Sequence, residues 1–361
     1  MRLGVALDLS SREPVRPQVD RAVTLLAHAE RYGFDSAWVG ESYHAAAQPF
    51  HLPSALMVLA HLAGRTSLAL GSAVLLLRAY SPEKLAYEAA LLDQLCGGRL
   101  TLGLGLGGSE VAGRAGLPAS GPAGAAFDAT LKLLRDAWSA DAGTDAPVAI
   151  PPPVRRGGPR ILVGGKVAAS ARRAATLADG FYGATNYCDD LLIKQSAAYW
   201  AYRDGRPGAT EGVVATTRFC VVHENAATAR ELAARHLKAA TDYYTERGLW
   251  MGADGPAQPE FPMVGTPDEI DATITRYVLA GVTSVQLRVA PFGMPPEVAR
   301  HTLDLVGRHV LPHWHDTTAS DAITYTTDLF DATNDSSHDD IRGDIRRDIG
   351  KDIRKQAKDA S

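Results

Sequence analysis

The chain has 361 residues, of which 46% are hydrophobic and 22% are charged. These fractions are ordinary for a globular protein, and they exclude a wholly disordered chain, a collagen-like repeat and a small disulfide scaffold. The formal net charge of −4 arises from the C-terminal end, because residues 316–361 hold 11 acidic and 7 basic side chains. The residues before Asp316 hold 30 acidic and 30 basic side chains and are neutral overall. A neutral body has no electrostatic footprint for nucleic acid, so we expect no nucleic-acid partner.

The cysteines and the start of the chain predict a cytoplasmic protein. Cys96, Cys188 and Cys220 are odd in number and lack the spacing of metal ligands, so we expect small buried thiols in a reducing compartment. At the N-terminus, Asp8 comes before any apolar segment long enough for a signal peptide. The longest strongly apolar stretch, residues 67–77, is too short to span a bilayer, and we therefore expect no membrane association.

Short apolar, β-rich runs alternate along the chain with longer segments in which apolar residues recur about every 3.6 positions. In chain order, the runs that predict strands are 3–7, 36–40, 68–77, 100–106, 160–163, 180–182, 213–222 and 284–289. The segments that predict helices are 19–32, 52–62, 82–95, 127–138, 167–178, 226–244, 267–280 and 295–311. Capping signals agree, because Ser81-Pro82 and Thr266-Pro267 each place a hydroxyl at the N-cap and proline at the first helical position.

This alternation predicts an α/β fold in which helical crossovers join the strands of a parallel sheet. An open doubly wound sheet and a closed (β/α)8 TIM barrel both fit the pattern. The count of eight strands and the length to about residue 315 favour the barrel, whose reactive face is formed by the C-terminal ends of its strands. We therefore expect one barrel domain over 1–315 and a separate polar tail over 316–361.

The predicted tail has a repeat of its own. It is rich in Thr, Asp, Ser and Asn, and the pair Asp-Ile recurs every four residues from Asp340 to Ile353. On a helix this repeat would stack like charges at i,i+4, and Gly343 and Gly350 would each cost up to about 1 kcal/mol. We expect a solvated, disordered tail, with a weak docking helix as the alternative.

Residues 103–108 match the pattern G-x-G-x-x-G after the fourth predicted strand. A dinucleotide fingerprint needs a helix that opens at the third glycine, and here glycine and proline interrupt the segment that follows. We interpret the segment as a strand end at which glycines, Gly105 and Gly107 among them, let a flat ligand lie close to the backbone.

A second glycine site, Gly164-Gly165-Lys166, directly follows the fifth predicted strand and precedes a helix. Free N–H groups at the start of a helix, the positive end of its dipole and a lysine together form an anion site. A plain turn between a strand and a helix also favours glycine. On spacing alone the two interpretations stay open.

The second predicted strand is followed by a cluster of polar side chains. Glu41, Ser42 and His44 would lie at the C-terminal end of a barrel strand, so they are our candidates for acid/base or hydrogen-bonding roles in catalysis. Simple loop solvation is the alternative for all three.

Other titratable residues give weaker signals. Asp8, at the end of the first strand, and Arg288, inside the last, are further candidates for the site, although Arg288 fits a strand-end ion pair equally well. His313 and His315 lack a third ligand at a suitable spacing, and we predict no metal site.

Several segments together resemble one family, the bacterial luciferase-like flavin monooxygenases and their deazaflavin-dependent relatives. The resemblance covers nearly all of residues 1–315 and depends on a combination of short motifs. The segments that carry it are 32–41, 70–77, 87–105, 159–165, 172–181 and 264–269.

The resemblance implies a TIM barrel that holds FMN or coenzyme F420 at its C-terminal mouth. In this family the flat ring lies against strands three and four, and the phosphate reaches the loop after strand five, where Gly164-Gly165-Lys166 stand here. The family often has a non-proline cis peptide bond in strand three, and the matching pair is Ala73-Val74. Thr185 is the remaining expected cofactor contact.

Two departures from the family pattern bear on function. The usual Glu-His-His after strand two reads Glu41-Ser42-Tyr43 here, with His44 one step later, so a catalytic histidine is displaced or absent. In F420-dependent sugar-phosphate dehydrogenases a glutamate follows the glycines of strand four, and this chain has Gly108 there. This second departure argues against that subgroup and leaves other F420 enzymes open.

The leading hypothesis is an FMN-dependent monooxygenase that uses reduced FMN and oxygen on a small organic substrate, with the reduced flavin supplied by a separate flavin reductase. We expect Leu75, Leu77 and Leu102 to form dry walls that exclude water. An F420-dependent hydride-transfer enzyme and a non-catalytic flavin-binding accessory protein are the alternatives. Because the family often dimerises through outer helices, a homodimer is one option.

Overall fold

The computed structural model describes residues 1–10, 13–42, 52–108, 111, 123–139, 151–204 and 212–315. The tail expected at 316–361 lies outside these ranges, and so does His44. Within them, no helix is both long enough and apolar enough to cross a membrane.

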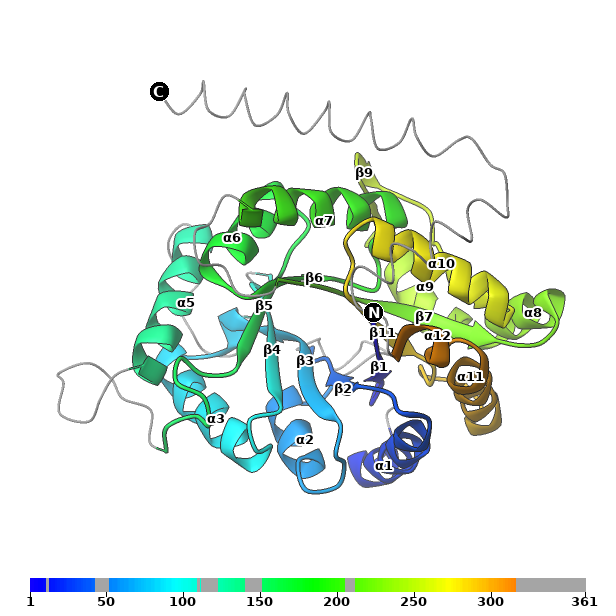
Figure 1. Ribbon diagram of the computed structural model, residues 1–361, viewed down its shortest axis with the longest axis horizontal. Helices are drawn as coiled ribbons and strands as arrows, with labels where there is room; N and C mark the ends of the chain where they lie inside the picture. The colour runs from blue at the N-terminus through cyan, green and yellow to red at the C-terminus, as the bar shows by residue number, and fades with distance from the viewer. Residues whose placement is uncertain are drawn as a thin grey trace.

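Eight parallel strands close into a barrel (Figure 1). Each strand pairs with the next in the order β1, β2, β3, β4, β5, β6, β7 and β11, and β11 pairs with β1 to complete the ring. Their bounds are β1 Arg2–Leu7, β2 Ser36–Val39, β3 Ala69–Leu76, β4 Leu100–Gly105, β5 Arg160–Gly164, β6 Gly180–Gly183, β7 Val213–Val222 and β11 Ser284–Arg288. The predicted TIM barrel is confirmed, and the open sheet is excluded.

Helices surround the barrel as an outer layer (Figure 1). Their bounds are α1 Val15–Tyr32, α2 Ala55–Leu62, α3 Pro82–Leu95, α5 Ala123–Ser139, α6 Ala168–Leu177, α7 Asp189–Asp204, α8 Ala226–His236, α9 Lys238–Thr245, α10 Pro267–Leu279, α11 Pro296–His309 and α12 Leu311–His315. A short 3-10 turn, Leu77–Ala79, follows β3, and a hairpin of β8 (Met251–Gly252) and β9 (Gly255–Pro256) follows α9. Strand β10 (Met263–Gly265) pairs with the end of β7.

The helix predictions fail at two places. The single helix expected over 226–244 is wrong, because α8 and α9 are separate helices that meet at Leu237. Helix α7 was not predicted at all. Its buried face carries Gln195, Ser196 and Arg203 between apolar residues, so the apolar period that reveals a helix in sequence is broken there.

The barrel interior and the layer outside it are packed differently. Most large apolar side chains fill the layer between strands and helices, while Trp38, Leu162, Tyr182 and Ala215 form a small cluster of their own. Trp38 fits because its neighbour on β3 is glycine: a Cβ at Gly71 would lie 2.3 Å from the indole ring. The cysteines are free and buried, as expected.

The register of β3 is irregular in the segment that faces the site. Its pairing with β4 shifts between Ser72 and Leu75, and the Ala73–Val74 peptide bond inside this bulge is cis. The cis bond expected from the family resemblance is therefore confirmed. Both residues lie in the second half of β3, toward its C-terminal end.

Candidate functional site

A cavity of about 780 Å3 opens at the C-terminal ends of the barrel strands. Its lining includes residues of β2, β3, β4, β5 and β6 and the loops after β5 and β6. All residues expected to contact a cofactor line it: Ala73, Val74, Gly105, Gly107, Gly164, Gly165, Lys166 and Thr185. The fold thus brings these residues together, while their role in binding stays a prediction.

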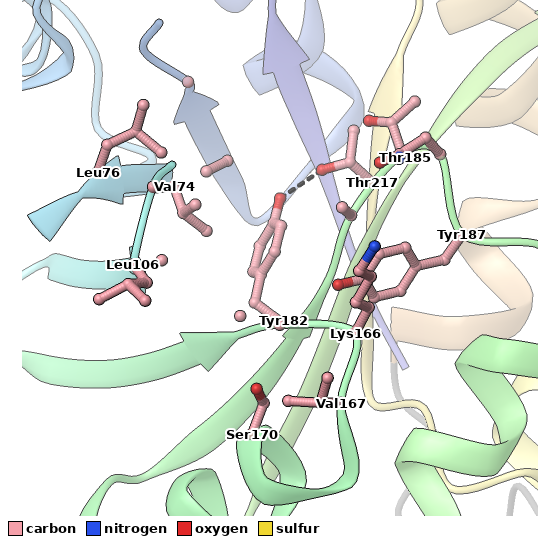
Figure 2. Close-up of a pocket in the computed structure, with 18 of the residues that line it drawn as sticks. Val74, Leu76, Leu106, Lys166, Val167, Ser170, Tyr182, Thr185, Tyr187 and Thr217 are labelled. Atoms are coloured by element: carbon pink, nitrogen blue, oxygen red, sulfur yellow. Dashed lines mark hydrogen bonds between the residues drawn. The ribbon is translucent and has the colours of Figure 1, made fainter. Parts of the chain in front are cut away.

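One wall of the cavity is apolar. Val74, Leu76 and Leu106 lie together on it, at the ends of β3 and β4 (Figure 2). This wall requires glycine at residue 105, because a Cβ there would lie only 2.8 Å from Val74 Cγ2. A flat ligand therefore meets aliphatic side chains and bare backbone on this side.

Another part of the cavity is the turn from β5 into α6. Lys166 and Val167 line it, and Val167 is the N-cap residue of α6 but makes no side-chain capping hydrogen bond. A Cβ on Gly165 would lie 2.2 Å from Ser170 Oγ, so glycine is what permits the close turn. The uncapped start of α6, the lysine and the Ser170 hydroxyl give this end of the cavity the character of an anion site.

Two buried tyrosines, Tyr182 and Tyr187, also line the cavity. The hydroxyl of Tyr182 hydrogen-bonds Thr217 Oγ1 (Figure 2). The Tyr182 ring packs beside Trp38 with centroids 5.5 Å apart. Burial raises the pKa of both Tyr182 and Tyr187 well above the usual phenol range. Both phenols therefore stay protonated at neutral pH.

Glu41 and Ser42 lie beside the cavity and are not among its lining residues. The Glu41 carboxylate is 6% exposed and accepts hydrogen bonds from Leu76 N at 2.8 Å and Tyr80 Oη at 2.6 Å. Ser42 Oγ accepts one from Leu52 N at 3.0 Å. These contacts tie the end of β2 to the cavity wall, and the catalytic roles expected for both residues stay predictions.

The expectation that Leu75, Leu77 and Leu102 line the site is wrong. All three are buried in the main hydrophobic core. Successive residues of a strand point to opposite faces, so on β3 Leu76 faces the cavity and Leu75 faces the helices.

Several residues that line the cavity were not predicted from the sequence. These are Ser170 and Arg173 on α6, Tyr182 on β6, Tyr187 after it and Thr217 on β7. The position of Ser170, in the first turn after the glycine site, was a usable signal. Of the lining residues that the structure describes, none is Asp, Glu or His.

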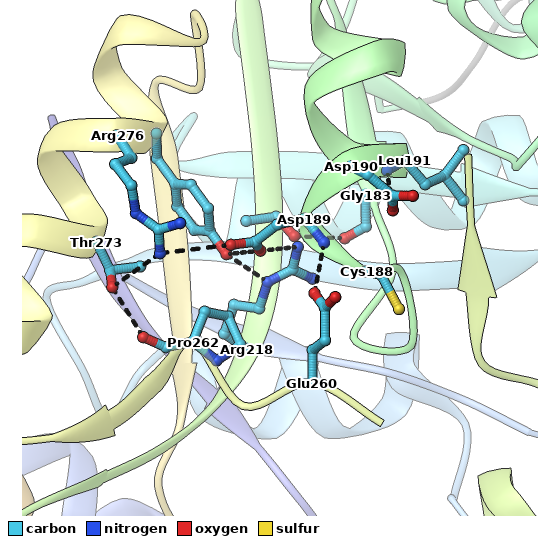
Figure 3. Close-up of polar contacts among 12 residues, drawn as sticks. Gly183, Cys188, Asp189, Asp190, Leu191, Arg218, Glu260, Pro262, Thr273 and Arg276 are labelled. Atoms are coloured by element: carbon cyan, nitrogen blue, oxygen red, sulfur yellow. Dashed lines mark hydrogen bonds and ion pairs between the residues drawn. The ribbon is translucent and has the colours of Figure 1, made fainter. Parts of the chain in front are cut away.

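A polar network around Arg218 and Asp189 (Figure 3) holds the loop after β6. Residues Ala184 to Tyr187 of this loop line the site. Arg218 on β7 is 1% exposed, and its Nη1 donates to the carbonyl of Ala184 at 3.2 Å. Its Nε donates to Tyr277 Oη at 2.8 Å, and its Nη2 lies 3.4 Å from Asp189 Oδ1. Burial lowers the pKa of this guanidinium, but Tyr277 and Asp189 outweigh that and raise it.

Comparison with protein families matches residues 1–284 to the luciferase-like monooxygenase family. The chain belongs to this family. A curated relative of this luciferase-like protein, the uncharacterized protein y4vJ of Sinorhizobium fredii (strain NBRC 101917 / NGR234), is 37% identical over 99 residues. That match covers 27% of this chain and 26% of the relative, so it spans about a quarter of the relative's length.

Solved structures with the same fold include both FMN and F420 proteins. Monooxygenase RslO1 from Streptomyces bottropensis is 24% identical, with a TM-score of 0.71 over 87% of this chain and 100% of that one. The oxygenating constituent of 3,6-diketocamphane monooxygenase from Pseudomonas putida, in complex with FMN, is 19% identical, with a TM-score of 0.71 over 86% and 98%. The coenzyme F420-dependent tetrahydromethanopterin reductase from Methanopyrus kandleri is 18% identical, with a TM-score of 0.62 over 87% and 99%.

Proposed function

We propose that this luciferase-like protein is an FMN-dependent monooxygenase that acts on a small organic substrate with reduced FMN and oxygen. One observation carries the proposal: a single cavity joins an apolar wall at Val74 and Leu76 to the turn at Gly165 and Lys166 that leads into the uncapped start of α6. FMN has a flat ring system, which fits the apolar wall, and one phosphate tail, which fits the turn. The FMN complex of the similarly folded diketocamphane monooxygenase supports this choice of cofactor.

The described residues fit such a cofactor. Lys166, Ser170 Oγ and the first N–H groups of α6 would hold the phosphate. Val74 and the bare backbone at Gly105 and Gly164 would lie against the ring. When bound, FMN would supply the redox chemistry with oxygen, which no protein side chain provides.

The remaining residues of the cavity would shield the reacting atoms from water and orient the cofactor or the substrate. The aliphatic wall at Val74, Leu76 and Leu106 would exclude water from the reacting atoms. Tyr182 and Tyr187, protonated at neutral pH, would donate hydrogen bonds to the cofactor or the substrate.

A second candidate function is F420-dependent hydride transfer. Thr185 lines the cavity, and the similarly folded tetrahydromethanopterin reductase is F420-dependent. A flavin-binding accessory role is the third option, because Glu41 and Ser42 make contacts that need no catalysis. For the leading function we also propose a separate flavin reductase as partner and a cytoplasmic location.

The test uses the purified full-length chain. FMN, reduced FMN and reduced F420 are titrated separately, and oxygen consumption is then followed with a flavin reductase, NADH and a panel of small ketones, aldehydes and aromatic compounds. We expect saturable binding of reduced FMN and substrate-dependent oxygen uptake. Tight binding of F420 alone would support the second candidate, FMN binding without turnover would support the third, and no binding of either cofactor would contradict all three.

A further inference from the structure

Two histidines and a glutamate that do not line the cavity meet at another place on the protein. His223 and Glu224 directly follow the end of β7, and His301 lies on α11. One potential ligand atom from each residue lies within 4.8 Å of the others. His301 Nε2 is 3.0 Å from Glu224 Oε2, and His223 Nδ1 is 3.5 Å from the same oxygen.

We infer that this trio, the His-Glu-His cluster, is a binding site for a transition-metal ion of the Zn2+ type. Two imidazole nitrogens and one carboxylate oxygen form a ligand set that suits Zn2+, with water in the fourth position. Ligand atoms about 2.0–2.1 Å from a tetrahedral Zn2+ lie about 3.3 Å from one another. The two separations measured to Glu224 Oε2 fall on either side of that value.

The backbone beside the cluster holds its two halves in register. Val222 N, next to His223, donates a 3.1 Å hydrogen bond to the buried hydroxyl of Thr302, next to His301. His223 N in turn donates to the carbonyl of Gly265 on β10 at 3.1 Å. Both histidines therefore project from fixed points of β7 and α11, so an ion finds them pre-positioned.

The cluster is open to a cation from solvent. The side chains are 30% exposed for His223, 61% for Glu224 and 41% for His301, which leaves an open path from solvent. Asn225 N donates to His223 Nδ1 at 3.0 Å, and a metal ion would replace this exposed donor.

The cluster joins structural elements that are distant in sequence. A bound ion would link the end of β7, which pairs with β10, to α11, the helix that follows β11. We therefore expect the ion to stabilise the fold rather than to enter the chemistry in the cavity. This inference is independent of which cofactor the cavity takes.

The experiment measures binding of Zn2+ itself to the full chain, prepared without a histidine tag, by isothermal titration at pH 7.5. We expect one site of 1:1 stoichiometry and a rise of several degrees in melting temperature with Zn2+. His223→Ala and His301→Ala should each weaken that site by at least about 100-fold, since even residues behind the ligands of metal sites typically change affinity about 10–100-fold.

The matched control is His28→Ala. His28 is also a histidine beside a carboxylate, with Nε2 at 2.7 Å from Asp304 Oδ1, but it belongs to no three-ligand group among the described residues. This variant should bind Zn2+ as the parent does. Co2+ gives an independent readout, because tetrahedral nitrogen and oxygen ligands produce visible absorption bands that His301→Ala should abolish. The inference is overturned if the parent shows no 1:1 site, or if His223→Ala and His301→Ala bind Zn2+ and Co2+ as His28→Ala does.

Discussion

Arg288, the last residue of β11, donates from Nε to Asp8 Oδ2 at 2.9 Å, immediately beyond the end of β1. The pair joins the last barrel strand to the first at the C-terminal mouth, and Arg288 also lines the cavity. Burial lowers the pKa of Arg288, but the nearby Asp8 charge and Tyr244 outweigh that effect and raise it. The guanidinium is therefore a permanent cation in the wall of the site.

This pair should be strongly coupled. Arg288→Met leaves the fully buried Asp8 carboxylate without its counter-charge, and Asp8→Asn leaves the cation unpaired. Each single change should lower the free energy of unfolding by about 3–5 kcal/mol, the usual cost of an uncompensated buried charge. The double variant should lose clearly less than the sum of the two. Urea denaturation of the four proteins checks this, and additive losses would show that the two side chains do not interact.

Arg218 should support both stability and the cavity loop. Arg218→Met leaves Asp189 and the Ala184 carbonyl without this donor, so we expect a loss of about 3–5 kcal/mol in unfolding free energy and weaker FMN binding. Arg276→Ala is the control, because this arginine is 47% exposed and lies 3.6 Å from the same carboxylate. Exposed pairs contribute about 0–1 kcal/mol, so the control should change little. Equal effects of the two variants in thermal unfolding would contradict this role.

The buried thiols should make the protein sensitive to alkaline pH. Burial raises the pKa of Cys96 and Cys188 to about 11, against 9.0 for an exposed thiol. The folded chain thus binds these protons more tightly than the unfolded chain. Their contribution to the free energy of unfolding is therefore complete below pH 9 and is lost as pH rises from about 9 to 11. Urea midpoints measured across that window should fall, and they should fall less in Cys96→Ala/Cys188→Ala.

The same burial predicts slow thiol chemistry. At pH 8 about one in a thousand of these thiols is ionised, so a thiol reagent such as Ellman's reagent should label the native chain slowly and the urea-unfolded chain at once. Rapid labelling of the native protein would contradict the burial of Cys96 and Cys188.

The barrel was predictable from sequence because its strands are buried on both faces and many of them read as plain apolar runs, as in residues 161–163 of β5. Helix α7 was not, since its buried Gln195 and Arg203 look like surface residues until the neighbouring elements are known. The residues of the candidate site also differ in whether the sequence alone reveals them. The glycine turn at Gly165 is a local signal, whereas the inward direction of Leu76 depends on the bulge and register of β3.

The long-range contacts of the site could not be read from sequence spacing. Tyr182 and Thr217 are 35 positions apart and meet only because β6 pairs with β7. Glu41 is a catalytic candidate because it follows a barrel strand. The donors to its carboxylate, Leu76 N and Tyr80 Oη, come from another strand and the turn after it. Such hydrogen-bond partners can be identified only once the strands are placed in the closed barrel.

The central claim is that a flat cofactor lies in this cavity with its phosphate beside Lys166. The most direct test compares FMN with riboflavin, which has the same ring and no phosphate, by quenching of flavin fluorescence. The proteins are the parent, Lys166→Glu, and Lys194→Glu as a control at an exposed lysine that does not line the cavity. We expect the parent and Lys194→Glu to prefer FMN over riboflavin by about 100-fold or more, in line with about 1.5–3 kcal/mol per hydrogen bond to a charged group. Lys166→Glu should lose most of that preference. Equal affinity of the parent for the two flavins, or an unchanged preference in Lys166→Glu, would contradict the claim.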